Sequence, residues 1–115
     1  MTSTRVIVNI EYRAQQGRVD EAVSELDTLI ATVVATEADC FSIRLLQNSQ
    51  DPSKLLLIEE WSSQDAYLGP HFQTPHIQAF IARAVETFEG PPVIQFWFPK
   101  SEHLREVSHG VRGLA

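Results

Sequence analysis

The chain has 115 residues, of which 43% are hydrophobic and 21% are charged, and its formal net charge at pH 7 is −6. This length suits one domain, and the apolar fraction is that of a folded chain rather than a disordered one. The acidic balance, without any basic cluster, argues against a nucleic-acid partner. No apolar run approaches the roughly 18 residues of a membrane span, and the N-terminal segment lacks a signal-peptide layout. We therefore expect a cytoplasmic protein with no membrane association.

The first expected elements are a strand and a long helix. In residues 5–12, β-branched and apolar residues alternate with polar ones, which predicts a strand. After Gly17, apolar residues recur at the spacing of an amphipathic helix. They are Ala22, Val23, Leu26, Leu29, Ile30, Val33 and Val34. The pattern predicts a helix of about five turns that begins at Val19 and ends at residues 37–39.

Two alternating segments follow, over residues 40–47 and 54–61. Between them lies a polar stretch that reads Asn48-Ser49-Gln50-Asp51-Pro52-Ser53 and is typical of a turn. The two segments should therefore form an antiparallel hairpin. The single cysteine, Cys40, excludes an internal disulfide, and we interpret it as a small buried hydrophobe.

The last third of the chain carries strong start and stop signals. A Ser-Ser-Gln-Asp sequence suits the start of a short helix that Gly69 and Pro70 end. Thr74 and Pro75 then open a second helix, as N-cap and first helical residue, which extends to residue 86 and buries Ile77, Phe80, Ile81, Ala84 and Val85. After the Gly-Pro-Pro sequence at 90–92, residues 93–98 form the final strand.

The resulting order is β-α-β-β-α-β, an α+β ferredoxin-like arrangement with an antiparallel sheet. We assign residues 1–99 to this domain. Residues 100–115 carry little periodicity and are interpreted as a C-terminal tail, helical at most around residues 102–107.

Alternate strand positions define two predicted faces of the sheet. One is apolar and comprises Val6, Val8, Ile10, Phe41, Ile43, Leu45, Leu56, Ile58, Ile94, Phe96 and Phe98. The other mixes polar groups with large rings and comprises Asn9, Glu11, Ser42, Arg44, Glu59, Trp61, Gln95 and Trp97. Two helices cover only one face, and a face left to water should be polar. We therefore expect a homodimer, with a ligand pocket on the mixed face.

The most informative stretch is residues 55–80. A strand ends there in Glu-x-Trp, followed by a polar helix start, an Ala, a His and a Thr-Pro-His-x-x-x-Phe segment. The positions are Glu59, Trp61, Ala66, His71, Thr74, Pro75, His76 and Phe80. This string resembles the antibiotic biosynthesis monooxygenase family, which includes quinol and anthrone monooxygenases. The resemblance implies a dimeric α+β barrel and a cavity lined by an Asn of the first strand and a Trp of the third, matched here by Asn9 and Trp61.

The function that the resemblance implies is a monooxygenase that works without a cofactor on a small aromatic or polycyclic phenol, quinol or anthrone. A base removes a proton from the substrate, the anion reduces O2, and a peroxide collapses to a quinone and water. The sequence contains neither GxGxxG nor GxxxxGK[ST], so it has no recognisable binding motif for a nucleotide cofactor. Its histidines lack the spacing of a metal site, and no metal is expected.

Three residues are the candidates for catalysis. His71 has the ordinary imidazole pKa that suits a base at neutral pH. Asn9 is expected to hydrogen-bond the developing oxyanion, with Arg44 as the alternative donor, and Trp61 is expected to form one wall of the pocket. The expected substrate-binding residues are Arg44, Glu59, Tyr67, Phe72, His76, Phe80, Gln95 and Trp97.

Each candidate also has a purely structural interpretation. Trp61 suits a core position, Asn9 suits a hydrogen-bonded structural amide, and Glu59 suits an ion pair with Arg44 across the hairpin. The proton acceptor stays open between His71, His76 and Glu59. The alternative functions are a non-catalytic dimeric metabolite-binding protein, or an isomerase or haem-degrading enzyme of the same fold.

Overall fold

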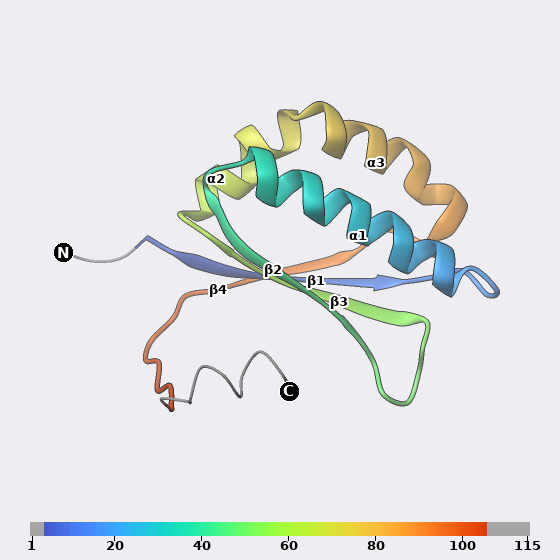
Figure 1. Ribbon diagram of the computed structural model, residues 1–115, viewed down its shortest axis with the longest axis horizontal. Coiled ribbons are helices and arrows are strands. Elements are labelled where there is room, and N and C mark those ends of the chain that lie inside the picture. Colours follow the sequence, from blue (N-terminus) through green and yellow to red (C-terminus); the bar gives the residue numbers. More distant parts are fainter. Residues whose placement is uncertain (1–3, 106–115) are drawn as a thin grey trace, which may run out of the picture.

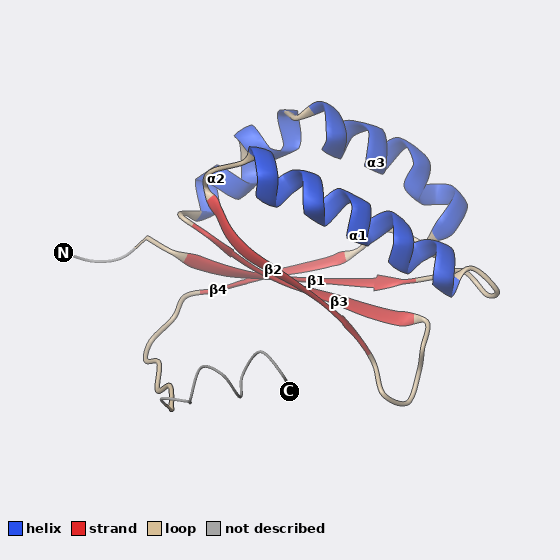
Figure 2. Cartoon of the chain, in the orientation of Figure 1, coloured by secondary structure: helices blue, strands red, loops and turns tan. Residues whose placement is uncertain are grey.

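The computed structural model describes residues 4–105. The elements follow one another as β1 (Val6–Arg13), α1 (Val19–Thr36), β2 (Cys40–Gln47), β3 (Lys54–Trp61), α2 (Gln64–Leu68), the 3₁₀-helix η1 (Pro70–Gln73), α3 (Pro75–Thr87) and β4 (Val93–Trp97). The strands form one antiparallel sheet in the order β2-β3-β1-β4, and the helices cover one of its faces (Figures 1 and 2). The predicted ferredoxin-like α+β fold is therefore confirmed.

The segment after β4 forms no regular secondary structure as far as residue 105. The predicted helical turn around residues 102–107 is thus absent at 102–105, and the remainder of the predicted tail, residues 106–115, lies outside the described residues. Among residues 4–105, no helix has the length and apolar content that a membrane crossing demands.

Side-chain caps fix the two helix starts that flank η1. The hydroxyl of Ser63 accepts a hydrogen bond from the backbone N–H of Ala66 at 3.1 Å, and Thr74 Oγ1 accepts from the N–H of Ile77 at 3.4 Å. Pro75 occupies the first position of α3, where its missing N–H leaves no donor unsatisfied. Both predicted helix starts are confirmed, and together they confine His71 to a single short turn between α2 and α3.

The register between β1 and β3 decides which side chains face the helices. Val8 lies opposite Glu59 and Val6 opposite Trp61. Because directly opposed residues of an antiparallel pair share a face, Glu59 and Trp61 lie on the helix-covered face with Val8. The predicted grouping, which placed these two residues with Asn9, is wrong. Alternation within a strand gives its two sets of residues, but only the pairing shows which set faces which layer.

A β-bulge near the start of β2 changes the phase of that strand as well. Cys40 pairs with Trp61, but Ser42 pairs with Glu60, so Phe41 is an extra residue between them. The predicted apolar-face position of Phe41 is therefore wrong, and its ring is exposed beside the guanidinium of Arg5. Cys40 is buried, as expected of a small hydrophobe.

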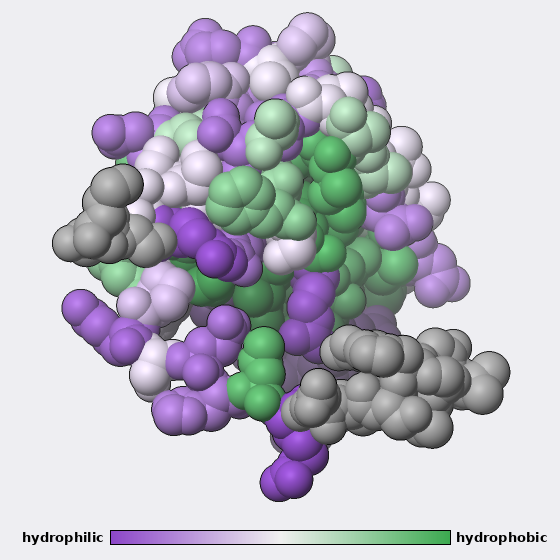
Figure 3. Space-filling view, turned by 60° about the vertical axis from the view of Figure 1, so that its left-hand side comes forward, coloured by the Kyte–Doolittle hydropathy of each residue, from purple (hydrophilic) through white to green (hydrophobic). Residues whose placement is uncertain are grey.

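The core lies between the sheet and the helices. It is built from Val6, Val8, Ile10, Tyr12, Leu55, Leu57 and Trp61 of the strands and from Ala22, Leu26, Val33, Ile77 and Phe80 of the helices. On the face of the molecule that Figure 3 shows, hydrophobic residues gather across the middle, with more hydrophilic residues around them. Ile81 and Val85, which we expected to be buried in this core, are 49% and 75% exposed and border a cavity.

The packing of α1 makes a direct stability prediction. Leu26 is 0% exposed whereas Val34, on the same helix, is 48% exposed. We expect Leu26→Ala to lower the free energy of unfolding by about 2–5 kcal/mol, because the lost side chain leaves a cavity. Val34→Ala should change it by less than about 1 kcal/mol. Urea unfolding followed by circular dichroism measures both values, and equal losses would contradict this orientation of α1.

Candidate active site

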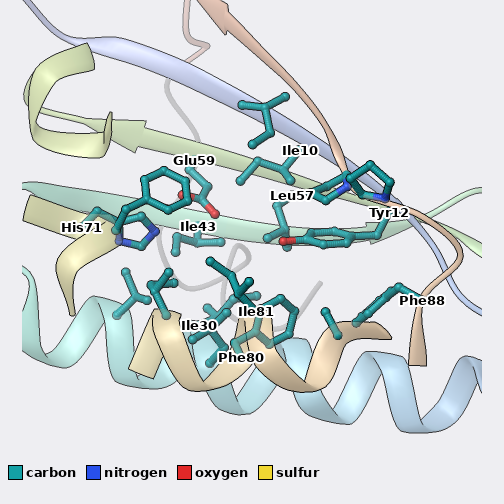
Figure 4. Close-up of a pocket in the computed structure, with 18 of the residues that line it drawn as sticks. Ile10, Tyr12, Ile30, Ile43, Leu57, Glu59, His71, Phe80, Ile81 and Phe88 are labelled. Atoms are coloured by element: carbon teal, nitrogen blue, oxygen red, sulfur yellow. The ribbon is translucent and has the colours of Figure 1, made fainter. Parts of the chain in front are cut away.

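A cavity of about 780 Å³ lies between the sheet and helices α1 and α3. Figure 4 shows side chains of the strands and of the helices pointing toward one another across it. Its volume falls within the roughly 300–1,000 Å³ that is usual for small-molecule sites. The apolar lining includes Ile10, Leu29, Ile30, Val33, Ile43, Leu57, Phe72, Ile77, Phe80 and Phe88. The polar side chains within this lining are few, and the cavity therefore suits a largely apolar ligand.

Glu59 contributes a buried carboxyl group to the cavity wall. It is 4% exposed, and its Oε1 accepts a hydrogen bond from Trp61 Nε1 at 2.8 Å. Burial raises the pKa of Glu59 to about 7, against the opposing effect of the Trp61 hydrogen bond and with a small contribution from the charge of Glu37. Near neutral pH this carboxyl group can therefore both donate and accept a proton.

His71 lies near Glu59 at the same end of the cavity (Figure 4). Its ring is 4.6 Å from the ring of Trp61 and 5.0 Å from that of Tyr67, measured between centroids. Its Nδ1 is 2.9 and 3.1 Å from the two carboxylate oxygens of Glu37. Because an ionised carboxylate only accepts hydrogen bonds, Nδ1 carries the proton and Nε2 carries the lone pair. Within residues 4–105, Nε2 has no hydrogen-bond partner.

The electrostatic environment keeps His71 neutral. Burial lowers its pKa, and the hydrogen bond and charge of Glu37 oppose this only in part. A neutral imidazole with a free Nε2 on a cavity wall is a proton acceptor. Burial also raises the pKa of the Tyr12 and Tyr67 hydroxyls, with the charge of Glu59 adding to the effect. Both phenols therefore stay protonated and can donate hydrogen bonds into the site.

Glu37 is a site residue that the sequence analysis missed. It caps the C-terminal end of α1, and its Oε2 also lies 2.6 Å from His76 Nε2. The sequence did contain one signal, an acidic residue at the C-terminal end of α1, where the helix dipole favours cations and disfavours a carboxylate. That signal identifies no partner, since the two histidines lie 34 and 39 positions further along the chain.

The structure brings together several of the predicted site residues. Glu59, Tyr67, His71, Phe72 and Phe80 line the cavity. Trp61 does not line it but packs directly against His71 and Tyr67. His76 is bonded to Glu37 and borders a separate, smaller groove between α1 and α3.

Four predicted site residues lie elsewhere, on the face of the sheet that the helices leave open. Asn9 pairs with Gln95 and Ile58, Arg44 pairs with Ile58, and Trp97 pairs with Ile7. The prediction that Asn9 and Trp61 line one cavity is therefore wrong, because the two side chains lie on opposite faces of the sheet. The predicted ion pair between Glu59 and Arg44 is wrong for the same reason.

The described part of the chain contains no recognisable metal site. Among residues 4–105, no group of three or more His, Cys, Asp or Glu side chains is arranged to hold a metal ion.

Comparison with known proteins places this geometry in context. The model of the antibiotic biosynthesis monooxygenase family matches residues 5–83. PA3566 from Pseudomonas aeruginosa is 25% identical, with a TM-score of 0.77 over 88% of this chain and 99% of that one. Rv0793 from Mycobacterium tuberculosis is 24% identical, with a TM-score of 0.74 over 85% and 97% of the two chains.

A candidate antibiotic biosynthesis monooxygenase from Caulobacter crescentus is 24% identical to this chain. Its TM-score is 0.77 over 86% of this chain and 92% of that one. The likeness to this structure and to Rv0793 is one of fold. No curated protein sequence matches the chain.

The burial of Glu59 predicts a specific pH dependence of stability. Its pKa is about 7 in the folded state against an ordinary value of 4.5, so between these pH values the folded chain binds more protons than the unfolded chain. The contribution of Glu59 to stability must therefore fall as pH rises through this window. Glu59→Gln removes the titration but keeps an oxygen that can accept from Trp61 Nε1.

We expect the unfolding free energy of the wild type, minus that of Glu59→Gln, to decrease by about 3 kcal/mol between pH 4.5 and 8. Urea unfolding at a series of pH values measures it. The subtraction cancels the opposite contribution of His71, and Glu102→Gln, at an exposed site, serves as control. A difference that does not vary with pH would contradict the burial of an ionisable Glu59.

Proposed function

This chain belongs to the antibiotic biosynthesis monooxygenase family, and on that basis we propose that it oxidises a small polycyclic phenol, quinol or anthrone with O2. The observation that carries the proposal is the pairing of an apolar cavity with the neutral His71 at one end. We further propose that the reaction needs no bound cofactor, because the substrate itself supplies the electrons.

The shape and lining of the cavity support a flat, uncharged substrate. Aliphatic and aromatic side chains from the sheet and from both long helices surround it, so ring surface is buried on either side. The buried Glu59 and, behind His71, the carboxylate of Glu37 disfavour a ligand that carries a negative charge. A phenol or an enolisable ketone places its one polar group at this end and its rings along the walls.

In the proposed reaction, His71 Nε2 takes a proton from the acidic position of the substrate. The resulting anion transfers electrons to O2, and a carbon–oxygen bond forms to give a peroxide. The protonated peroxide then loses water, as the O–O bond breaks and a carbonyl forms at the same carbon. One oxygen atom enters the product and the other leaves as water, and the two hydrogens that the substrate loses balance the two in that water.

The neighbouring groups suit the stabilisation of charge in this reaction. The Tyr67 hydroxyl stays protonated, as its raised pKa requires, and can donate to an oxyanion. Glu59, with a pKa of about 7, can return a proton to the peroxide. Trp61 holds Glu59 by its indole N–H and packs against His71, and we assign it this supporting role.

Anthrone is a suitable probe, since its conversion to anthraquinone and water consumes one O2. With ¹⁸O2, we expect one ¹⁸O atom in each anthraquinone and no turnover without oxygen. His71→Asn, which keeps an amide that can reach Glu37, should lower kcat by about 10²–10⁴-fold. The exposed His103 offers a matched control in His103→Gln, which should retain wild-type kcat.

Spontaneous oxidation of anthrone is subtracted from the rates measured without protein. Wild-type turnover that persists in His71→Asn would contradict the proposal. Anthrone that raises the melting temperature without turning over would indicate the metabolite-binding alternative instead. A product that forms under argon would indicate an isomerase.

We also propose that the chain forms a homodimer through the open face of the sheet. This face carries large exposed side chains, which include Phe41, Val93 and Trp97, among intermediate aliphatic residues such as Ile7 and Ile58. A second copy can cover such a face, and a stable interface of this kind buries roughly 1,200–2,000 Å². Asn9, Arg44 and Gln95 would then lie at the dimer interface.

The dimer is tested by a charge on the open face. Light scattering after size exclusion should give the wild type twice the chain mass of 13.0 kDa. We expect Trp97→Glu to give the mass of one chain, because a buried unpaired carboxylate opposes association. Leu68→Glu, at an equally exposed site on α2, should remain a dimer. A monomeric wild type would refute this assembly.

A further inference from the structure

Three ionisable side chains from three different helical segments meet behind the cavity. Glu37 comes from the end of α1, His71 from η1 and His76 from the first turn of α3. The carboxylate lies within 2.9 Å of His71 Nδ1 and within 2.6 Å of His76 Nε2. The side chains of Glu37, His71 and His76 are 11%, 6% and 20% exposed, so this contact is largely shielded from water.

The position of Glu37 is unfavourable without its two partners. Its carboxylate lies at the negative end of the α1 macrodipole, and the last turn of α1 contains no basic residue. A largely buried carboxylate also loses its hydration. Here two imidazole N–H groups replace the lost hydration. His71 Nδ1–H donates to Glu37 Oε1 at 2.9 Å, and His76 Nε2–H donates to Glu37 Oε2 at 2.6 Å. The three residues therefore form a mutually dependent unit.

We propose that Glu37 and His76 are positioning residues for His71, which deepens the proposed function and rests on it. Glu37 holds the His71 ring with the proton on Nδ1 and the lone pair of Nε2 free for the substrate. His76 donates to the far oxygen of Glu37 and keeps that carboxylate directed at His71. His71 lines the cavity whereas Glu37 and His76 do not, so neither of these two touches the substrate.

The two positioning residues act on His71 in opposite directions. When Nε2 takes the substrate proton, the imidazolium forms next to the Glu37 carboxylate, which stabilises it. His76 donates a hydrogen bond to the same carboxylate, which weakens the effect of Glu37 on His71, and a protonated His76 also places a positive charge near His71. The pKa of His71 follows this balance, since Glu37 raises it and His76 lowers it on top of the larger effect of burial. The other rings packed around His71 are those of Tyr67, Phe72 and Trp61, and Glu59 accepts a hydrogen bond from Trp61.

Nitrogen-15 NMR of the histidine side chains in the free protein tests the arrangement without any substrate. At neutral pH, we expect the proton of His71 on Nδ1 and an unprotonated Nε2. A pH titration should give a lower pKa of His71 in Glu37→Gln and a higher one in His76→Gln. His103→Gln should leave it unchanged. A His71 proton on Nε2, or shifts in the same direction in the first two variants, would overturn the proposal.

Kinetics with anthrone provide the second readout. We expect Glu37→Gln to lower kcat by about 100-fold or more with little change in KM, since loss of the orienting acid in a comparable His–acid pair costs about 10⁴-fold. The acidic limb of the pH–rate profile should move to lower pH in Glu37→Gln and to higher pH in His76→Gln. A purely structural role would lower the rate in both variants and leave the limb in place, which would refute the proposal.

The two readouts separate this proposal from the proposed function. If the wild type does not oxidise anthrone, that substrate assignment fails, while the His71 tautomer and the opposed pKa shifts still decide the positioning roles. If Glu37→Gln does not fold, as judged by circular dichroism, the same decision rests on His76→Gln, whose amide retains a donor for Glu37. An unchanged pKa of His71 in a folded His76→Gln would then overturn it.

Discussion

The antiparallel register between β1 and β3 is the constraint on which the site depends. Because Val8 lies opposite Glu59, the acidic end of β3 faces the helices rather than the open face. The same register brings Trp61 against His71 and Tyr67. A shift of one residue would turn every side chain of β3 to the other face, which would remove the Glu59 carboxyl group from the cavity and the Trp61 indole from His71.

Burial on this face gives the site its acid–base character. Loss of water raises the pKa of the Glu59 carboxyl group to about 7 and lowers the pKa of the His71 imidazole, because each shift disfavours a buried charge. Within one apolar chamber, the carboxyl group can therefore donate a proton near neutral pH, and the imidazole is present in its neutral, proton-accepting form. Such a pair of oppositely shifted groups marks a functional site in many enzymes. Glu37 supplies a carboxylate that accepts hydrogen bonds from the two neighbouring histidines.

Much of the fold followed from local patterns. The bounds of β2 and β3, the start of α1 at Val19 and the capped starts at Ser63 and Thr74 are as predicted. Periodicity and capping succeed because they involve residues within about one turn of each other. His71, Glu59 and Tyr67 were also placed among the site residues, since the resemblance depends on a short continuous stretch.

The sequence by itself determined the elements, their order and the family of the chain, because each of these depends on neighbouring residues. Only the tertiary structure decided which strand residues meet the helices, since the β1–β3 register and the bulge at Phe41 arise from pairing between distant strands. It therefore removed Asn9 and Arg44 from the cavity and brought Glu37 into contact with His71, which lines it. Contacts between residues more than 30 positions apart, such as those of Glu37 with the two histidines, depend on how the layers pack and leave no local signal of their partner.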